Sequence, residues 1–167
     1  MNWETHVQNR HNAVAMILHW GFAALFAYGV FKQVGDLSDL QDPGLLLFEM
    51  IFAAIFLALL GGRYVYMQRH YRSPLPPDTP QWQIGLASYV QSGMYLTLGT
   101  TAVSGLVMGT LVYSGITTGI WMKAMLGAHM LSVQMAYWLI GIHVLGALYH
   151  RARQDGVWES MVPTRKR

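Results

Sequence analysis

Cysteine is absent from the 167-residue sequence, and charged residues make up only 11% of it. Without cysteine the chain forms no disulfide, no thiolate-bound zinc site and no cysteine-ligated cluster. An average soluble domain carries about 25% charged residues, whereas here 53% of the residues are hydrophobic, which indicates a membrane protein. Because the net charge is only +3 and the basic residues are concentrated in particular loops, we expect no binding to nucleic acid.

Proline is also absent from four long apolar stretches, each long enough to cross a bilayer core, which takes about 20 residues per helix. None of them has the alternating pattern of a β-strand. No segment resembles a cleavable signal peptide, because the first apolar run follows a polar segment and lacks an A-x-A-like end. We therefore predict an all-α membrane protein, a single four-transmembrane-helix domain over residues 1–167, with spans at about 13–31, 44–62, 84–112 and 123–150.

Lysine and arginine are unevenly distributed among the segments that join the spans. The segment after the second span and the C-terminal tail are rich in them, whereas the other two connections carry one lysine each. Since cytoplasmic loops are enriched in Lys and Arg, we predict that both termini are cytoplasmic in a multi-pass protein of the bacterial inner membrane. Within the basic connection, SPLPPDTPQWQ (residues 73–83) predicts an extended, proline-rich linker.

Three histidines lie inside the spans, where an imidazole is costly without a partner. His19 and His143 each lie at a similar distance from the cytoplasmic end of a span, roughly 10 Å deep. Two neutral imidazoles on facing helices at one depth are what a six-coordinate haem iron requires, and without cysteine such a haem is of the non-covalent b type. The alternatives are an interhelical hydrogen bond, a proton relay, or a transition-metal site, for which no third ligand lies at this depth.

His129 is the third intramembrane histidine, and it lies on nearly the same helix face as His143. The two are about 21 Å apart along the helix. This is the spacing of two stacked haem sites, one near each membrane surface. The second site would need another ligand at the start of the second span, which contains no histidine.

Two segments carry motifs of a known family. RHNAVAMILHW (residues 10–20) places an arginine upstream of an L-H-W triplet, and HMLSVQMAYWLIGIHVLGALYHRARQDGVWESMVP (residues 129–163) combines two histidines with A-L-Y-H, D-G-V and a methionine near a final proline. With Tyr95 and SGLVMG (residues 104–109) in the third span, the sequence resembles the prokaryotic cytochrome b561 family over almost its whole length. The resemblance implies a four-helix membrane cytochrome whose b haems exchange electrons with quinones and protein partners.

The resemblance also assigns haem ligands by position. It places the cytoplasmic-side ligands on His19 and His143, the pair that the depth argument selects. The periplasmic-side ligands fall on His129 and on Glu49, where the family has histidine. The family often has a further histidine four residues before the tyrosine of the third span, and here that residue is Gln91.

Three interpretations of the periplasmic site remain open. It holds no haem, with His129 as a polar helix contact paired with Glu49; it holds a haem with Met50 or Met108 as the second ligand, since His/Met ligation raises a haem's potential; or Glu49 itself ligates the iron or accepts protons. We favour the first, because a carboxylate is a poor axial partner for haem iron.

Other residues near the cytoplasmic surface are candidates for cofactor contact. His150 lies two turns from His143 and is expected to bond a haem propionate or a quinone carbonyl, or to anchor the helix at the interface. Arg10, together with Arg63, Arg151 and Arg153, would bind propionates, a quinone headgroup or lipid. Trp20, beside His19, is expected to pack on haem or lipid.

The function implied is electron transfer between the quinone pool, ubiquinone or menaquinone, and a redox partner protein or larger membrane complex. One alternative is a haem-bearing accessory or structural subunit of a larger complex. Another is a quinone-reducing oxidase of a small periplasmic reductant such as superoxide. We rank this last alternative lower, because attracting an anion requires a basic outer surface and the outer loops are neutral to acidic.

Overall fold

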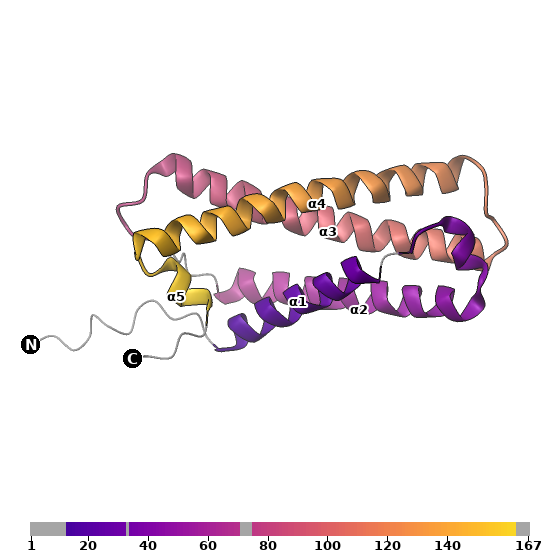
Figure 1. The fold of residues 1–167 in the computed structure, drawn as a ribbon, viewed down its shortest axis with the longest axis horizontal. Coiled ribbons are helices and arrows are strands. Elements are labelled where there is room, and N and C mark those ends of the chain that lie inside the picture. The colour runs from indigo at the N-terminus through magenta and orange to yellow at the C-terminus, as the bar shows by residue number, and fades with distance from the viewer. Residues whose placement is uncertain (1–12, 33, 71–74, 163–167) are drawn as a thin grey trace, which may run out of the picture.

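A computed structural model describes residues 13–32, 34–70 and 75–162 of the chain. Within these ranges the structure consists of helices joined by short connections: α1 (Ala13–Phe31), η2 (Leu37–Gln41), α2 (Pro43–His70), α3 (Gln81–Tyr113), α4 (Ile120–Arg153) and α5 (Val157–Met161). The four long helices lie side by side as an elongated bundle, with η2 at one end and α5 at the other (Figure 1). We call these the η2 end and the α5 end.

The four predicted spans are confirmed as helices, and α1 has the predicted bounds. The other three helices are longer than predicted. The length of an apolar stretch reflects the thickness of the hydrocarbon core, and a helix can continue beyond that core into polar residues. The predicted linker at residues 73–83 is partly wrong. Its described part is non-helical only as far as Pro80, and α3 begins at Gln81.

Local sequence signals set several of these boundaries. Asp36 caps η2 by accepting a hydrogen bond from the Ser38 amide (2.7 Å), and Asp42 accepts one from the Leu45 amide (2.7 Å) at the start of α2. Pro43 occupies the first position of α2, where its missing N–H costs nothing. At the far end of α4 the chain reverses through Gly156, whose φ of 89° favours glycine, and α5 follows directly.

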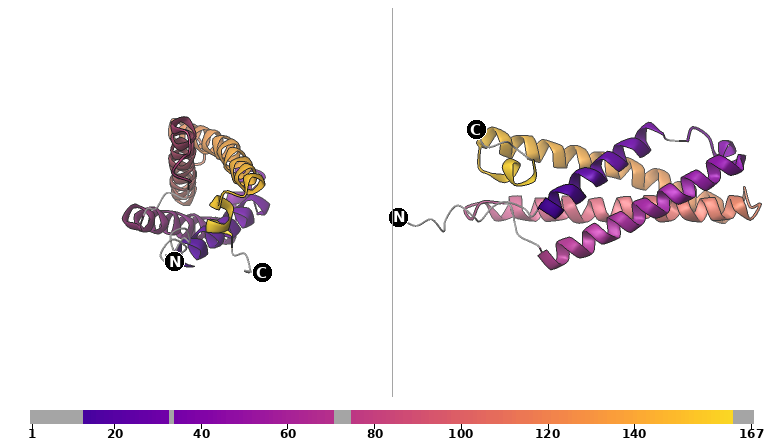
Figure 2. Two further views of the ribbon diagram at one scale, coloured as in Figure 1. Left: turned by 90° about the vertical axis from the view of Figure 1, so that its left-hand side faces the viewer. Right: turned by 90° about the horizontal axis from the view of Figure 1, so that it is seen from below.

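The long helices pack in chain order, α1 on α2, α2 on α3 and α3 on α4. Figure 2 shows this arrangement along the bundle and from below. Contact between α1 and α4 is made by side chains, including Phe26 against Tyr137 with ring centroids 6.4 Å apart. Two apolar clusters hold the bundle, one in its middle around Phe56, Leu98 and Ala136, and one near the η2 end. The second contains Leu46, Met108, Val112 and Met122.

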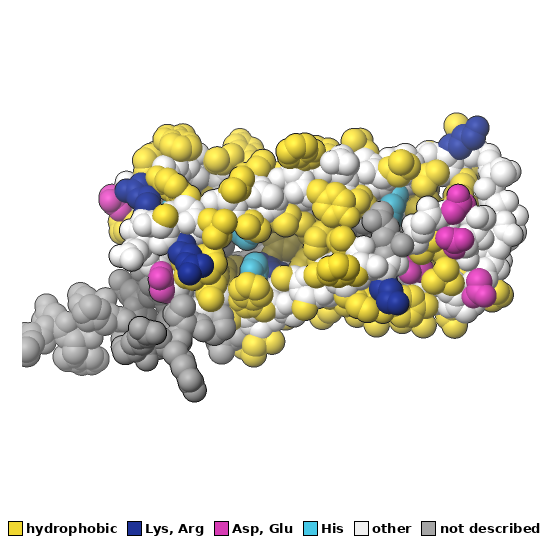
Figure 3. All heavy atoms as spheres, in the orientation of Figure 1, with side chains coloured by type: hydrophobic (Ala, Val, Ile, Leu, Met, Phe, Trp, Pro, Cys, Tyr) yellow, Lys and Arg dark blue, Asp and Glu magenta, His cyan; other side chains and the backbone are white. Residues whose placement is uncertain are grey.

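The outer faces of the bundle are apolar. All four long helices are long and apolar enough to cross a membrane, and only 6% to 33% of the most apolar window of each is buried within the protein. Figure 3 shows hydrophobic side chains over the middle of one face, with charged side chains gathered mainly towards the two ends. Such a surface is stable in contact with lipid, so we treat the four helices as transmembrane.

Candidate functional site

His19 of α1 and His143 of α4 face each other in the half of the bundle nearer the α5 end. Their ring centroids are 6.1 Å apart and their planes are inclined by 57°. His19 is half-buried and His143 is exposed. Two residues far apart in the sequence thus bring their imidazoles together across the α1–α4 interface.

This separation fits two imidazoles that share one metal ion. With metal–nitrogen bonds of about 2.0 Å, and each ring centroid about 1 Å beyond its nitrogen, two such rings stand about 6 Å apart. Among the described residues there is no group of three or more His, Asp or Glu that could hold a bare metal ion. Haem iron takes only two ligands from the protein, so the pair of His19 and His143 would fit a haem.

Arg63 of α2 links His19 to α3. Its NH1 atom lies 2.9 Å from His19 Nδ1, and its Nε donates to the hydroxyl of Tyr95 at 3.2 Å. Because a guanidinium only donates, His19 Nδ1 accepts, which in a neutral ring leaves the hydrogen on Nε2. If His19 were to hold a haem iron through Nε2, its bond with Arg63 would have to rearrange.

Trp20 contacts His19 on one side and α5 on the other. The two rings are edge to face with centroids 5.5 Å apart, and Trp20 Nε1 donates to the carbonyl oxygen of Met161 at 2.9 Å. The prediction placed Trp20 against haem or lipid. The structure adds a role that was not predicted: Trp20 ties α5 to α1, the helix that carries His19.

The side chain of His150 is hydrogen-bonded to Asp155, five residues further along the chain. Its Nδ1 lies 2.6 Å from Asp155 Oδ2, and both side chains are mostly buried. Partial burial by itself would raise the pKa of Asp155. The hydrogen bonds from His150 and the Val157 amide, with the nearby charges of His150 and Arg153, outweigh it and lower that pKa. His150 thus holds the turn into α5, a partner that the sequence analysis did not identify.

His129 of α4 is bound to α3 in the half of the bundle nearer the η2 end. Its Nδ1 lies 3.0 Å from the carbonyl oxygen of Thr101 and 3.1 Å from the hydroxyl of Ser104, and its ring packs against Gly105. Because a carbonyl only accepts, Nδ1 carries the hydrogen when it bonds Thr101, and Nε2 then keeps its lone pair. In this structure His129 therefore makes polar contacts with α3.

The predicted partners of His129 do not meet it in the described structure. Glu49 is half-buried, and no hydrogen bond or ion pair among the described residues joins it to His129. Met50 packs against α3, where a Cβ on Gly109 would lie 3.2 Å from its sulfur. Met108 is buried in the apolar cluster near the η2 end. Arg10, the remaining predicted contact residue, lies outside the described residues.

The comparison with known proteins decides the family. A family model described as prokaryotic cytochrome b561 matches residues 10–164. The chain belongs to the prokaryotic cytochrome b561 family. One relative, cytochrome b561 homolog 1 of Escherichia coli (strain K12), is 26% identical over 178 aligned positions, which cover 95% of this chain and 99% of the relative. No solved structure matches the chain.

Membership of the cytochrome b561 family implies a membrane protein that transfers electrons through b-type haem. The residues that sequence reasoning missed around the paired histidines are Tyr95, as a partner of Arg63, and Asp155, as a partner of His150. The signal for Asp155 was present, since an acidic residue followed by glycine directly after a helix end is typical of a turn.

Proposed function

We propose that this cytochrome b561 family member holds one b-type haem between His19 and His143 and transfers single electrons between the quinone pool and a redox partner. The observation that carries the proposal is the 6.1 Å separation of two imidazoles supplied by the first and last long helices. The haem iron would supply the one-electron chemistry. The contribution of the chain is to hold, orient and cover that group.

The residues around the paired histidines suit this task. Arg63 is a cation next to His19 in an apolar bundle, where a haem carboxylate would be stabilised by a charge-assisted hydrogen bond. Trp20 limits the movement of the His19 ring by packing against it edge to face. The α5 helix lies at the same end of the bundle and is tied to both α1 and α4.

A single haem is the better-supported number. Near the η2 end, the Nδ1 atom of His129 is engaged by Thr101 and Ser104, and the position where the family has a second histidine carries Glu49. Among the described residues, His129 is the one histidine in that half of the bundle.

We propose that the α5 end faces the cytoplasm of a bacterial inner membrane. Basic residues lie in the last turns of α2 and α4, at this end: Arg69, His70, His150, Arg151 and Arg153. The opposite end carries Asp36, Asp39 and Asp42. This distribution follows the enrichment of Lys and Arg in cytoplasmic loops.

The same charges argue against oxidation of superoxide at the η2 end. At this end the carboxylates of Asp36, Asp39 and Asp42 outnumber Lys32 and Lys123, and hydrogen bonds from the Ser38 hydroxyl and amide lower the pKa of Asp36. A negative surface repels an anionic reductant.

The alternative of an accessory subunit is distinguished from electron transfer by measuring the rate of haem reduction. An electron carrier is reduced by quinol, or by its reduced partner, at least as fast as the whole complex turns over, whereas a structural haem is not.

The experiment is a haem assay on the purified full chain. We expect a b-type pyridine haemochrome spectrum with about one haem per chain. His19→Ala and His143→Ala should each lose most of the haem, while His70→Ala, which removes an exposed histidine from α2, should retain it. A ratio near two would contradict the single site, and full haem retention in His143→Ala would contradict the ligand assignment.

A further inference from the structure

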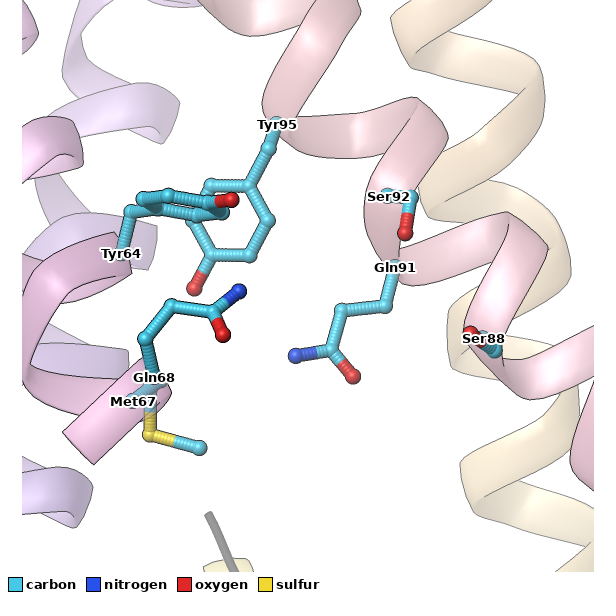
Figure 4. A pocket seen from close by; sticks show the side chains of 7 residues that line it. All are labelled: Tyr64, Met67, Gln68, Ser88, Gln91, Ser92 and Tyr95. Carbon is cyan, nitrogen blue, oxygen red and sulfur yellow. The ribbon is translucent and has the colours of Figure 1, made fainter. Parts of the chain in front are cut away.

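A polar pocket lies between α2 and α3, near the α5 end of the bundle. Its volume is about 230 Å³. It is lined by Tyr64, Met67 and Gln68 of α2, and by Ser88, Gln91, Ser92 and Tyr95 of α3. Figure 4 shows the side-chain amides of Gln68 and Gln91 pointing from opposite helices into the same space.

Among the residues that the structure describes, the lining offers uncharged hydrogen-bonding groups and no charged ones. Gln68, Gln91 and the two serines make no side-chain hydrogen bond to any described residue. Each amide has both donors and an acceptor, so the pocket suits a neutral ligand with carbonyl or hydroxyl oxygens. An anionic headgroup would be expected to require Lys or Arg in the lining.

The pocket has the size of one substituted ring. A cavity of about 150 Å³ in a protein interior accepts benzene, and this one is larger, at about 230 Å³. Tyr64 and Tyr95 form one aromatic side of it, edge to face with centroids 5.2 Å apart. The other groups that reach the space are polar, apart from the Met67 thioether, which suits a planar ring with polar substituents.

Tyr95 also connects the pocket with the paired histidines. Its hydroxyl accepts from Arg63 Nε, and Arg63 donates to His19 Nδ1. The hydroxyl hydrogen of Tyr95 has no acceptor among the described residues, so it can be donated to a ligand in the pocket. A ligand bound there would be separated from His19 by two side chains.

We propose that this pocket binds the uncharged, carbonyl-bearing headgroup of a membrane amphiphile, held by Gln68, Gln91 and Tyr95. The inference rests on the proposed function only in one respect: Tyr95 bonds Arg63, the cation that would stabilise a haem carboxylate beside His19. It differs from the sequence-based assignment of a headgroup to His150 and the surface arginines, since His150 is engaged by Asp155. Two sources supply this chemistry: a quinone ring and the ester carbonyls of a lipid.

The test measures binding of a short-chain benzoquinone to the haem-loaded full chain in nanodiscs by calorimetry. Gln68→Leu and Gln91→Leu should each raise the Kd about two- to tenfold, the effect of one lost hydrogen bond between uncharged groups. The matched control is Gln134→Leu, which changes an exposed glutamine of α4 outside the pocket and should leave the Kd unchanged. Retained helical content and haem load verify that each variant is folded.

Two further experiments identify the source of the headgroup and test whether its binding affects the haem through Tyr95 and Arg63. If lipid ester carbonyls compete for the pocket, the benzoquinone binds more tightly in nanodiscs of ether-linked phosphatidylcholine than in ester-linked ones; equal Kd values identify the quinone ring as the occupant. Tyr95→Phe should abolish the change in the haem absorption spectrum caused by benzoquinone.

Unchanged Kd values in both glutamine variants would overturn the proposed pocket while leaving the histidine pair intact. Conversely, a protein that binds no haem but shows the predicted Kd changes would overturn the proposed function and leave the pocket standing.

Discussion

The hydrogen bond between His150 and Asp155 should determine how firmly the C-terminal segment closes the α5 end of the bundle. We define this segment, residues 154–162, as the C-terminal strap. Asp155→Ala removes the acceptor for His150 Nδ1, at 2.6 Å, and the weaker acceptor for the Val157 amide, at 3.3 Å. The strap keeps its other attachments, the bond from Trp20 to Met161 and the Arg151 guanidinium 4.8 Å above the ring of Trp158.

The free-energy contribution of the hydrogen bond between His150 and Asp155 depends on how far the two side chains are buried. The side chains of His150 and Asp155 are 15% and 18% exposed, so solvent screens their interaction only in part. A hydrogen bond to a charged group contributes about 1.5–3 kcal/mol, and partial exposure places this one near the lower limit, at about 1.5–2 kcal/mol. Because about 1.4 kcal/mol corresponds to a factor of ten, the population of the open strap should increase about 10- to 30-fold.

Amide hydrogen exchange of residues 157–162 measures this opening directly. We expect exchange in Asp155→Ala to accelerate by that factor, while the amides in the middle of α4 remain unchanged. Glu159→Ala is the control, because Glu159 is exposed on the same short helix. Equal exchange rates in Asp155→Ala and the wild type, or equal acceleration in the control, would refute the reasoning.

Two further predictions concern pH and packing. The pKa of Asp155 is lowered in the folded state, so its contribution to the strap is complete above the unfolded value of about 3.9 and is lost as the pH falls through the lower folded pKa; exchange of the strap amides, corrected for intrinsic rates, should therefore accelerate only below about pH 4. Gly109→Ala should lower the free energy of unfolding by about 1–3 kcal/mol through overpacking, since its Cβ would lie 2.7 Å from Met50 Cγ. Thermal unfolding in detergent measures this loss, which Met50→Ala in the same chain should partly restore, whereas Gly127→Ala, with no atom within 4 Å of the new Cβ, should show no packing penalty.

The positions of the spans were predictable because the bilayer imposes a length on apolar stretches. The bounds of α1 agree with the prediction since Lys32 and the polar segment after it end both the apolar run and the helix. α2 continues from Gly62 to His70 because its polar last turns still satisfy their backbone hydrogen bonds within the helix. Hydrophobicity shows where an apolar run ends, but it does not show where the backbone hydrogen bonds of the helix end. The predicted spans for α2, α3 and α4 were therefore shorter than the helices.

The depth of the histidine pair was predictable, whereas its surroundings were not. The rise per residue places His19 and His143 at one level. Which way a neighbouring side chain points depends on the rotation of its helix, and a helix that is apolar on all sides carries no stripe from which to read that rotation. The contacts of Arg63 with His19 and Tyr95 therefore required coordinates.

The asymmetry of the bundle connects these observations. Nearer the η2 end, His129 is bound to α3, and Met50 and Met108 fill the space between helices with flexible apolar groups. Nearer the α5 end, the paired histidines, the bridge through Arg63 to Tyr95, the polar pocket and the strap all lie in one half of the bundle. A single haem in that half would leave the other half without a redox group of this chain. Electrons that cross the whole bilayer would then have to pass through a cofactor of a partner protein, which is why we include a redox partner in the proposed function.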